Sequence, residues 1–260
     1  MWKRGEVDFV QTRQLAWERV PDGLFCAGET RKVLSADPEH GACTWLVQLR
    51  NRHEGTLPAG ADVYVLEGAG TLNGITLEPD GYVFLPRGAR FSLAPDIGPL
   101  ILYIAFFGEP EVSAEAGTDN AVAVGTADGT WVSPTWTEGD TLQFGAFVKV
   151  LRSDSLGEAY VTFMRPGWSS PLEERHPNYE ESFRIYGDLM QGARGLMHAG
   201  AYSFRGPGIW HAPLYTRTGT MSFIRTSGPT VTDYHEPTGD RSCAALVART
   251  YRQFPAPSVS

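Results

Sequence analysis

The sequence lacks the features that would place it in a membrane or on a nucleic acid. Its longest apolar run, residues 100–107, has eight residues, whereas a helix needs about 20 apolar residues to span a bilayer. We therefore interpret this run as a buried strand. Lysine and arginine number 22 against 30 acidic residues, and they form no cluster. The net charge of -8 argues against a nucleic-acid partner and against binding to an anionic membrane surface.

Cysteines, targeting signals and common catalytic motifs are also scarce. The chain has three cysteines, Cys26, Cys43 and Cys243, which are widely spaced and form no CxxC pair. We interpret them as free thiols in a reducing cytoplasm. No apolar segment follows residues 1–5, so no signal peptide is predicted and the expected location is cytoplasmic. The absence of GxSxG, GxxxxGKS/T and HExxH motifs argues against a hydrolase elbow, a phosphate loop and a helical zinc site.

The chain does contain an internal repeat. Segments of the first half recur in the second half at separations that drift only from 117 residues (Lys32 to Lys149) to 120 residues (Pro86 to Gly206). The matched pairs are 32–34 with 149–151, 63–68 with 182–187, 77–81 with 196–200, and 86–91 with 206–211. We interpret this as a tandem duplication.

Each half has short β-branched and aromatic runs separated by Gly, Pro, Asp and Asn turns, with little helical periodicity. This pattern is typical of an all-β sandwich or barrel. The segment 109–129 is rich in small and polar residues and is the natural connection between the halves. We predict two β domains, residues 1–120 and 121–260.

Two motifs in the second half support a family resemblance. Residues 173–181, Glu-Glu-Arg-His-Pro-Asn-Tyr-Glu-Glu, are followed by Gly187 and resemble the cupin motif HxHxxx(x)E with its later glycine. Residues 206–211, Gly-Pro-Gly-Ile-Trp-His, resemble the second motif PxGxxH, with Gly206 in place of the usual proline. Residues 205–213 are also similar to the PPGxxHAP segment of anti-sigma-type cupin domains. With the duplication, the chain resembles a bicupin.

The resemblance implies a fold of two tandem jelly-roll barrels and a metal site in the second one. His176, Glu180 and His211 match ligands of the cupin motifs. Glu174 stands where the family usually has its first histidine, so it is either a fourth ligand or a solvated acid on a loop. Glu181 is the rival of Glu180, because the family tolerates either spacing. Residues two apart on a strand share a face, so Glu174 and His176 can point into one cavity.

The predicted cofactor is one divalent metal ion per chain, in the second barrel. Two histidines and two carboxylates form a hard, anionic donor set. This set favours Fe(II) or Mn(II), with Zn(II) and Ni(II) as alternatives.

The first half is predicted to be a degenerate barrel without a metal site. At a separation of 119 residues, Glu174, His176 and Glu180 correspond to residues without metal-binding side chains, and so does His211 at 120. These counterparts are Gly55, Leu57, Ala61 and Phe91. His53 is nearby but has no partner in the sequence pattern, so we interpret it as a surface residue.

Two further residues are candidates for a catalytic role. Arg184 shares a strand face with Glu180 and Ser182, from which it could bind a substrate carboxylate or enolate. The alternative is a rim residue paired with an acid. His198 could act as an acid or base, or simply lie in a loop. With Ser182, the predicted pocket lining consists of aromatic residues that could equally be ordinary core: Tyr186, Tyr202 and Trp210.

These features predict a metal-dependent bicupin enzyme with a small-molecule substrate. The leading hypothesis is an Fe(II) or Mn dioxygenase acting on a small, metal-chelating organic molecule. One alternative is a non-redox isomerase, lyase or hydrolase that uses the metal as a Lewis acid; the glutamate at position 174 favours it, because a bicupin aminohydrolase family has such a substitution. A third hypothesis is a non-catalytic binding or sensor protein. Edge strands and an inactive first half make a homodimer the expected assembly.

Overall fold

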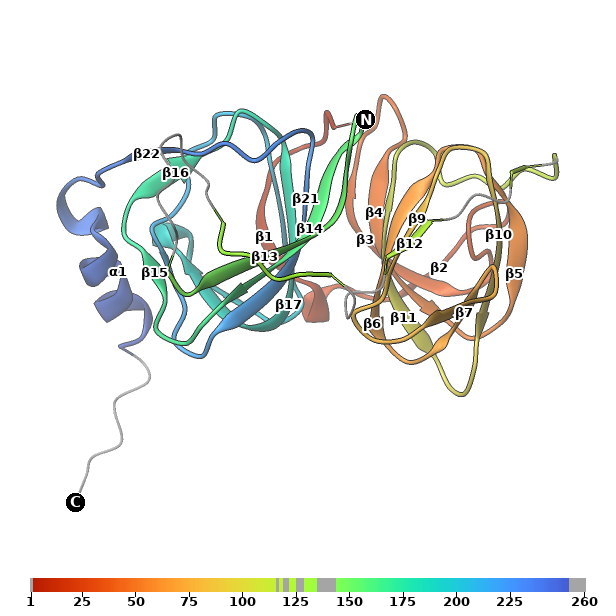
Figure 1. Cartoon of the computed structure of the whole chain (residues 1–260), viewed down its shortest axis with the longest axis horizontal. Coiled ribbons are helices and arrows are strands. Elements are labelled where there is room, and N and C mark those ends of the chain that lie inside the picture. Colours follow the sequence, from red (N-terminus) through yellow and green to blue (C-terminus); the bar gives the residue numbers. More distant parts are fainter. Residues whose placement is uncertain (1, 116, 119–121, 125–128, 135–143, 253–260) are drawn as a thin grey trace, which may run out of the picture. The chain divides into compact units, whose positions relative to one another are not determined.

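The chain folds almost entirely into antiparallel β-structure, as the sequence predicts. The computed structural model describes residues 2–115, 117–118, 122–124, 129–134 and 144–252 (Figure 1). Within these residues there is one α-helix, α1 (Cys243–Thr250). No helix of the described part is long and apolar enough to cross a membrane.

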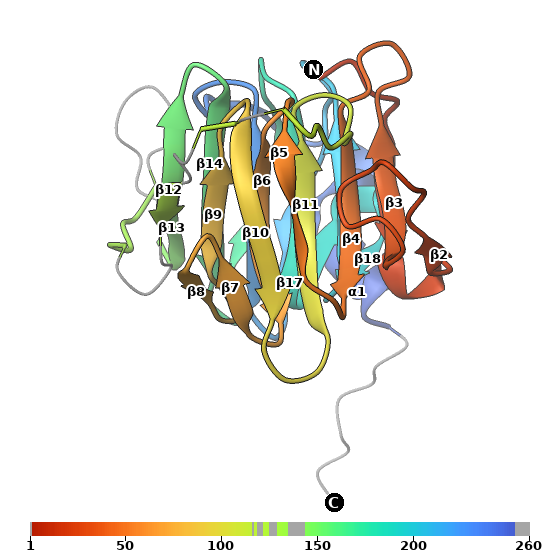
Figure 2. The same ribbon diagram turned by 90° about the vertical axis from the view of Figure 1, so that its right-hand side faces the viewer.

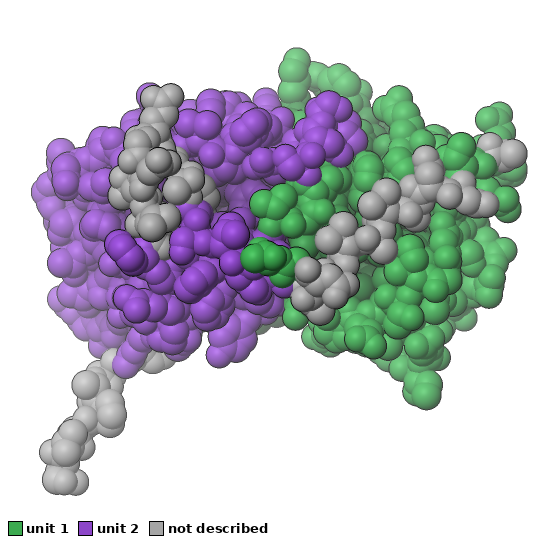
Figure 3. All heavy atoms as spheres, in the orientation of Figure 1, with its two compact units in different colours: residues 1–130, 150–152 green, residues 131–149, 153–260 purple. Residues whose placement is uncertain are grey.

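The chain divides into two compact units (Figure 3). Unit 1 comprises residues 1–130 and 150–152, and unit 2 comprises residues 131–149 and 153–260. The sequence-based boundary between residues 120 and 121 falls outside the described residues. Each unit carries one copy of the repeat, except that residues 150–151, which match 33–34, belong to unit 1.

Unit 1 is a β-barrel of two sheets. One sheet has the strand order β12-β9-β6-β11-β4-β3-β2, and the other, which faces the viewer in Figure 2, has the order β5-β10-β7-β8. The elements of this unit are β1 (Val7–Gln11), η1 (Thr12–Gln14), β2 (Glu18–Arg19), β3 (Thr30–Ala36), β4 (Cys43–Leu49), β5 (His53–Leu57), β6 (Ala61–Glu67), β7 (Gly70–Leu72), β8 (Ile75–Leu77), β9 (Tyr82–Leu85), β10 (Ala89–Pro95), β11 (Leu100–Phe106) and β12 (Val122–Val124). The run 100–107 thus contains the buried strand β11, as predicted.

The interior of unit 1 is filled by one apolar cluster. It draws alternate residues from β4, β6 and β11, because side chains of a strand alternate between its two faces. Leu57, Ala61 and Phe91 belong to this cluster. The ring of Phe91 packs on Phe25, with 4.6 Å between ring centroids.

Unit 2 repeats this plan around one long strand. Its main sheet contains the strand order β19-β17-β21-β14-β13, while the far end of β17 pairs with β18 and β20. The elements are β13 (Ala146–Asp154, of which 150–152 belong to unit 1), β14 (Gly157–Met164), β15 (Ser169–Ser170), β16 (Glu173–Arg175), β17 (Glu180–Gln191), η2 (Gly192–Arg194), β18 (Leu196–His198), β19 (Ala201–Arg205), β20 (Leu214–Tyr215), β21 (Thr220–Thr226), β22 (Asp233–His235), η3 (Gly239–Arg241) and α1.

Strand register identifies equivalent positions in the two units. Gly55 lies opposite Phe91, and Glu174 lies opposite His211 in the same kind of antiparallel pair. These are the pairs that the sequence repeat matches at separations of 119 and 120 residues. The structural equivalence therefore extends to the predicted ligand positions.

Candidate metal centre

The backbone fixes two of the predicted ligands next to each other. Glu174 and His211 exchange both backbone hydrogen bonds, at 2.8 and 2.9 Å between nitrogen and oxygen. The neighbouring Glu173 points to the other face of β16, where it pairs with His235 at 2.8 Å and with Arg241. Strand alternation therefore directs Glu174 toward His211 and Glu173 to the opposite face of β16, where it is also buried.

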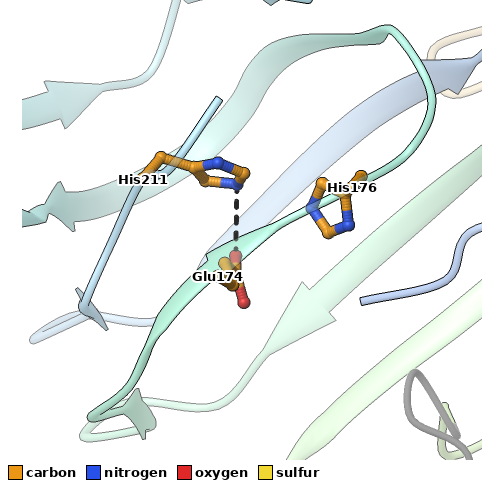
Figure 4. A group of neighbouring side chains, drawn as sticks. All are labelled: Glu174, His176 and His211. Atoms are coloured by element: carbon orange, nitrogen blue, oxygen red, sulfur yellow. Dashed lines mark ion pairs between the residues drawn. The ribbon is translucent and has the colours of Figure 1, made fainter. Parts of the chain in front are cut away.

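The predicted donor atoms converge inside unit 2. One ligand atom each from Glu174, His176 and His211 lies within 4.8 Å of the other two, and all three residues are buried (Figure 4). His211 Nε2 is 3.4 Å from Glu174 Oε1, the ion pair dashed in Figure 4. His176 Nε2 is 3.3 Å from Glu180 Oε2. The structure thus brings Glu174, His176 and His211 together, and Glu180 lies at the edge of this group, beside His176.

Hydrogen bonds on the far side of each imidazole orient its ring. His176 Nδ1 is 3.2 Å from the carbonyl oxygen of Val231 and 3.2 Å from Thr232 Oγ1. His211 Nδ1 is 3.0 Å from the carbonyl oxygen of Ile209. Because a carbonyl oxygen only accepts, each Nδ1 carries a proton, and Nε2 is the atom that faces the carboxylates and binds a metal ion once its own proton has left. This arrangement is typical of histidines that bind metals through Nε2.

Glu180 faces this cluster as a carboxylate. Burial alone would raise the pKa of Glu180, but the charges of His176, His211 and Arg205 outweigh it and lower that pKa. Arg205 Nη1 donates to Glu180 Oε1 at 3.3 Å, which leaves Oε2 directed at His176. A buried arginine therefore positions the carboxylate.

Glu181, the rival of Glu180, points into the opposite side of the sheet. Its Oε2 accepts from Arg225 Nη1 at 2.5 Å, and its Oε1 accepts from the hydroxyl of Tyr202 at 2.6 Å. Its side chain is fully buried among these partners. Geometry thus favours Glu180 as the ligand candidate.

The four candidate ligands line one cavity. Its volume is about 60 Å³, counted as the space open to the centres of water molecules; a single water needs roughly 10–15 Å³ by this measure. The cavity therefore accommodates a few water molecules or a small ligand. Its other lining residues are Tyr160, Thr162, Met164, Ser182, Arg184, Leu189, Gln191, Leu214, Ser222, Ile224, Thr230 and Thr232.

Arg184 provides a buried positive charge beside the candidate ligands. Its Nη1 donates to Thr220 Oγ1 at 3.1 Å and also to Ser222 Oγ. Its Nε has no hydrogen-bond partner among the described residues. Burial, together with the nearby charge of Arg205, lowers the pKa of Arg184 to about 9, although Glu180 opposes this effect.

A β-bulge corrects the prediction for Tyr186. Arg184 lies opposite Ser222 and Tyr186 opposite Met221, so β17 carries one extra residue between them. The bulge reverses the alternation of side chains. Tyr186 is consequently 58% exposed, and Leu189 faces the cavity instead.

Three other predicted residues also lie outside the cavity lining. The hydroxyl of Tyr202 binds Glu181 on the other face of the sheet. Trp210 packs between Arg175, at 4.7 Å, and His235, at 4.0 Å. His198 lies on β18 opposite Asp188, away from the candidate ligands.

Sequence reasoning missed Arg205, Gln191 and Tyr160. Arg205 directly precedes the second motif, and its guanidinium binds both Glu180 and Gln191. The sequence feature that points to Arg205 is its position directly before this motif. Gln191 reaches the cavity only because of the bulge in β17, and Tyr160 comes from a strand without any motif, so the sequence offered no signal for either.

Comparison with known proteins defines the fold class. No family model and no curated protein matches this chain. A crystal structure of a candidate dioxygenase from Nostoc punctiforme matches 88% of this chain and 87% of its own, with a TM-score of 0.72 and 21% identity. The chain therefore has the bicupin fold, with two cupin barrels in tandem.

Two oxalate decarboxylases share this fold. The enzyme from Lactobacillus farciminis, solved with formate, matches over 95% of this chain and 96% of its own, with a TM-score of 0.61 and 10% identity. The enzyme from Bacillus subtilis, which has Mn(II) centres, matches over 87% of this chain and 78% of its own, with a TM-score of 0.57 and 9% identity. At these identities the likeness concerns the fold.

Proposed function

We propose that unit 2 is the catalytic half of a metal-dependent enzyme whose small substrate carries negative charge and chelates the metal. The leading reaction class is dioxygenation with Fe(II) or Mn(II). One observation carries the proposal. The donor atoms of Glu174, His176 and His211 meet in a buried cavity that also contains the guanidinium of Arg184.

The donor set suits a single ion. Two donors at about 2.1 Å from one ion are roughly 3.0–3.4 Å apart at bond angles of about 90–110°. Two separations, 3.4 Å for His211–Glu174 and 3.3 Å for His176–Glu180, fall in this range, while the ligand atoms of Glu174, His176 and His211 as a group lie within 4.8 Å of one another. Two imidazoles and two carboxylates favour Mn(II) or Fe(II). Such an ion would supply Lewis acidity and, as Fe(II), redox chemistry with dioxygen.

The chain's own residues would bind and orient the substrate. Arg184 lines the cavity and supplies the positive charge for a carboxylate or enolate oxygen. Apolar side chains complete the wall and limit the access of water: Met164, Leu189, Leu214 and Ile224. Restricted water strengthens the electrostatic contacts of a bound anion.

A non-redox reaction is the second candidate. The candidate dioxygenase among the structural neighbours supports the first reaction class, and the oxalate decarboxylases support a small carboxylate substrate without net oxidation. The glutamate at position 174 adds an anionic ligand, which suits a metal that acts only as a Lewis acid.

A non-catalytic sensor is less well supported. That hypothesis gains weight if Glu174 faces solvent, but Glu174 is only 8% exposed and lies against His211. A buried carboxylate among two imidazoles is costly without a cation.

The first experiment measures metal content and oxygen consumption together. Protein purified anaerobically without chelators is analysed by mass spectrometry of metals, and the loaded protein is then screened in an oxygen electrode with small chelating carboxylates and diphenols. Near-stoichiometric iron and oxygen uptake are expected for a dioxygenase. Manganese or zinc with turnover but no oxygen uptake would support the non-redox reaction. No bound metal would contradict the proposal.

Two other sequence-based predictions remain predictions. A homodimer would sediment at roughly twice the chain mass of 28.5 kDa, and analytical ultracentrifugation of the metal-loaded protein tests this. The cytoplasmic location requires fractionation of cells that produce the full chain.

A further inference from the structure

A chain of polar side chains leads from the cavity of unit 2 toward solvent. The hydroxyl of Tyr160 lies 3.2 Å from Thr230 Oγ1. Thr230 Oγ1 donates to Glu158 Oε2 at 3.4 Å, and the backbone nitrogen of Thr230 donates to the same oxygen at 3.3 Å. The other carboxylate oxygen of Glu158 accepts from the hydroxyl of Ser153, an exposed residue, at 3.2 Å. The chain therefore has a buried end and an outer end.

The fold explains why these groups are aligned. Glu158 and Tyr160 are two residues apart on β14 and so share the face that also carries Thr162 and Met164 into the cavity. Tyr160 is buried and lines the cavity, whereas Glu158 is partly exposed. Thr230 follows β21, the strand paired with β14, and bridges the two side chains.

The hydrogen bonds have a defined direction. Thr230 has a single hydroxyl proton, which it donates to Glu158, so its oxygen accepts from Tyr160. A phenol that donates to Thr230 keeps its lone pairs available to a group in the cavity. Burial, and secondarily the charge of Glu180, raises the pKa of Tyr160, so the phenol stays neutral between transfers.

We propose that Tyr160, Thr230 and Glu158 form a proton relay that takes a proton from a substrate hydroxyl and releases it to solvent. The inference rests on the proposed function. In the step, the substrate O–H bond breaks and an O–H bond to Tyr160 forms. The phenol proton passes to Thr230, and the Thr230 proton passes to Glu158, which then loses it to water. The substrate keeps the electron pair as an oxyanion, and nothing is oxidised or reduced.

The relay can be tested without a ligand through the hydroxyl exchange of Tyr160. The full chain is labelled with ¹³C at Cζ of its ten tyrosines and observed by NMR in equal parts of H₂O and D₂O. A slowly exchanging hydroxyl gives two Cζ signals and a rapidly exchanging one gives a single signal. The variant Tyr160→Phe identifies the resonance. We expect one signal for Tyr160 in the wild type and two in Thr230→Val and in Glu158→Gln.

Thr162→Val is the matched control for Thr230→Val. Thr162 is on the same cavity wall, but its hydroxyl has no hydrogen-bond partner among the described residues. This variant should keep the single signal of Tyr160. Unchanged exchange in both Thr230→Val and Glu158→Gln, or equal slowing in Thr162→Val, would overturn the relay.

The second arm tests proton removal in the cavity. The probe is 4-nitrocatechol, a chelating diphenol whose ionisation changes its absorption, mixed with the metal-loaded protein in a stopped-flow instrument. Positioned acid–base groups typically contribute about 10²–10⁴-fold to a rate. We therefore expect ionisation of the bound probe to be about 100-fold slower in Tyr160→Phe, Thr230→Val and Glu158→Gln, with metal content equal to that of the wild type.

The outcomes separate the two proposals. Slower ionisation at equal metal content supports the relay, and wild-type rates in all three variants overturn it. If the metal-loaded wild type does not bind the probe, whereas Tyr160 exchange behaves as expected, the relay stands as a proton path and the proposed substrate class is wrong.

Discussion

The two barrels share the same strand register, but unit 1 has a filled apolar interior and unit 2 has a cavity with polar walls. In unit 1 the inward positions of β4, β6 and β11 form an apolar cluster, whereas the matched positions of unit 2 line the cavity. By register, Trp45, Val47, Val63, Val65, Leu102 and Ile104 correspond to Tyr160, Thr162, Ser182, Arg184, Ser222 and Ile224. One scaffold is therefore compatible with a filled core or with a polar site.

The difference shows what a polar interior requires. Buried polar groups are costly unless they are hydrogen-bonded or paired. Unit 2 meets this requirement with Arg205, which binds Glu180 and Gln191, whereas the register counterpart of Arg205 in unit 1 is Leu85. The site therefore depends on partners outside the cupin motifs as well as on the candidate ligands.

The proposed relay also distinguishes the two units, because its inner residue, Tyr160, corresponds to Trp45 in unit 1. Tyr160 lies opposite Ile224 just as Trp45 lies opposite Ile104. An indole only donates and cannot pass a proton through its nitrogen as a hydroxyl can. The proton path therefore belongs to unit 2 alone within these matched positions.

The largest effect should come from removing both imidazoles of the site. Loss of a single outer-shell partner typically costs about 10–100-fold in metal affinity, so we expect His176→Ala with His211→Ala to weaken binding by roughly 1,000-fold or more. Isothermal titration and metal analysis measure this. The matched control is His40→Ala with His53→Ala in unit 1, which should keep full metal content. Metal retained by the first double variant would contradict the assignment.

Unit 1, whose interior is filled by apolar side chains, should lose more unfolding free energy than unit 2 when a buried leucine is shortened to alanine. Leu57 is fully buried in the apolar cluster, and Leu→Ala changes in such cores cost about 2–5 kcal/mol of unfolding free energy. Leu189→Ala should cost less, because Leu189 already borders the cavity of unit 2. Urea denaturation, with metal content as a second measurement, tests the comparison. An equal loss in both variants would mean that the two interiors are equally well packed.

Arg205→Leu gives unit 2 the residue type that unit 1 has at this register position. The change leaves Glu180 buried without its cation, so the pKa of Glu180 should rise and metal affinity should fall by about 10–100-fold at neutral pH. The loss should shrink at higher pH, where Glu180 ionises again. The matched control is Arg152→Leu: Arg152 is also buried, but it binds Asp62 in unit 1. An unchanged affinity in Arg205→Leu would show that Arg205 does not position Glu180.

The last comparison concerns an acid that only unit 2 has. Burial acts to raise the pKa of Asp188, but hydrogen bonds from Thr218, Tyr251 and Thr216 outweigh it and lower that pKa; the position 119 residues earlier is Ala69. Hydrogen bonds to a charged group contribute about 1.5–3 kcal/mol. Asp188→Asn should lose roughly this amount at pH 7.

The pH dependence of this effect has a defined sign. The pKa of Asp188 is lower in the folded state than in the unfolded state, where it is about 3.9. The ionised carboxylate therefore stabilises the protein at pH values above the unfolded-state pKa, and this stabilisation is lost as the pH falls through the folded-state pKa. The free energies of unfolding of the wild type and of Asp188→Asn should therefore approach each other as the pH is lowered from 5. A constant difference over this range would exclude the ionised carboxylate as its cause.

Much of the fold and part of the site could be predicted from the sequence. The repeat indicated two equivalent β domains, and the strand register bears out the matching of Glu174 with Gly55 and of His211 with Phe91. Strand alternation placed Ser182 and Arg184 on the face of Glu180, and all three line the cavity. These features are local, because spacing and alternation fix them within a single strand or pair.

The remaining features depend on tertiary structure. The choice between Glu180 and Glu181, the outward position of Tyr186 and the contacts of Arg205 follow from a bulge and from strands far apart in the sequence. The sequence by itself determined the duplication, the β-class and the candidate ligand positions, because these depend on residue type and spacing. Only the tertiary structure decided which polar groups meet in the cavity, because burial and hydrogen-bond partners depend on the pairing of distant strands.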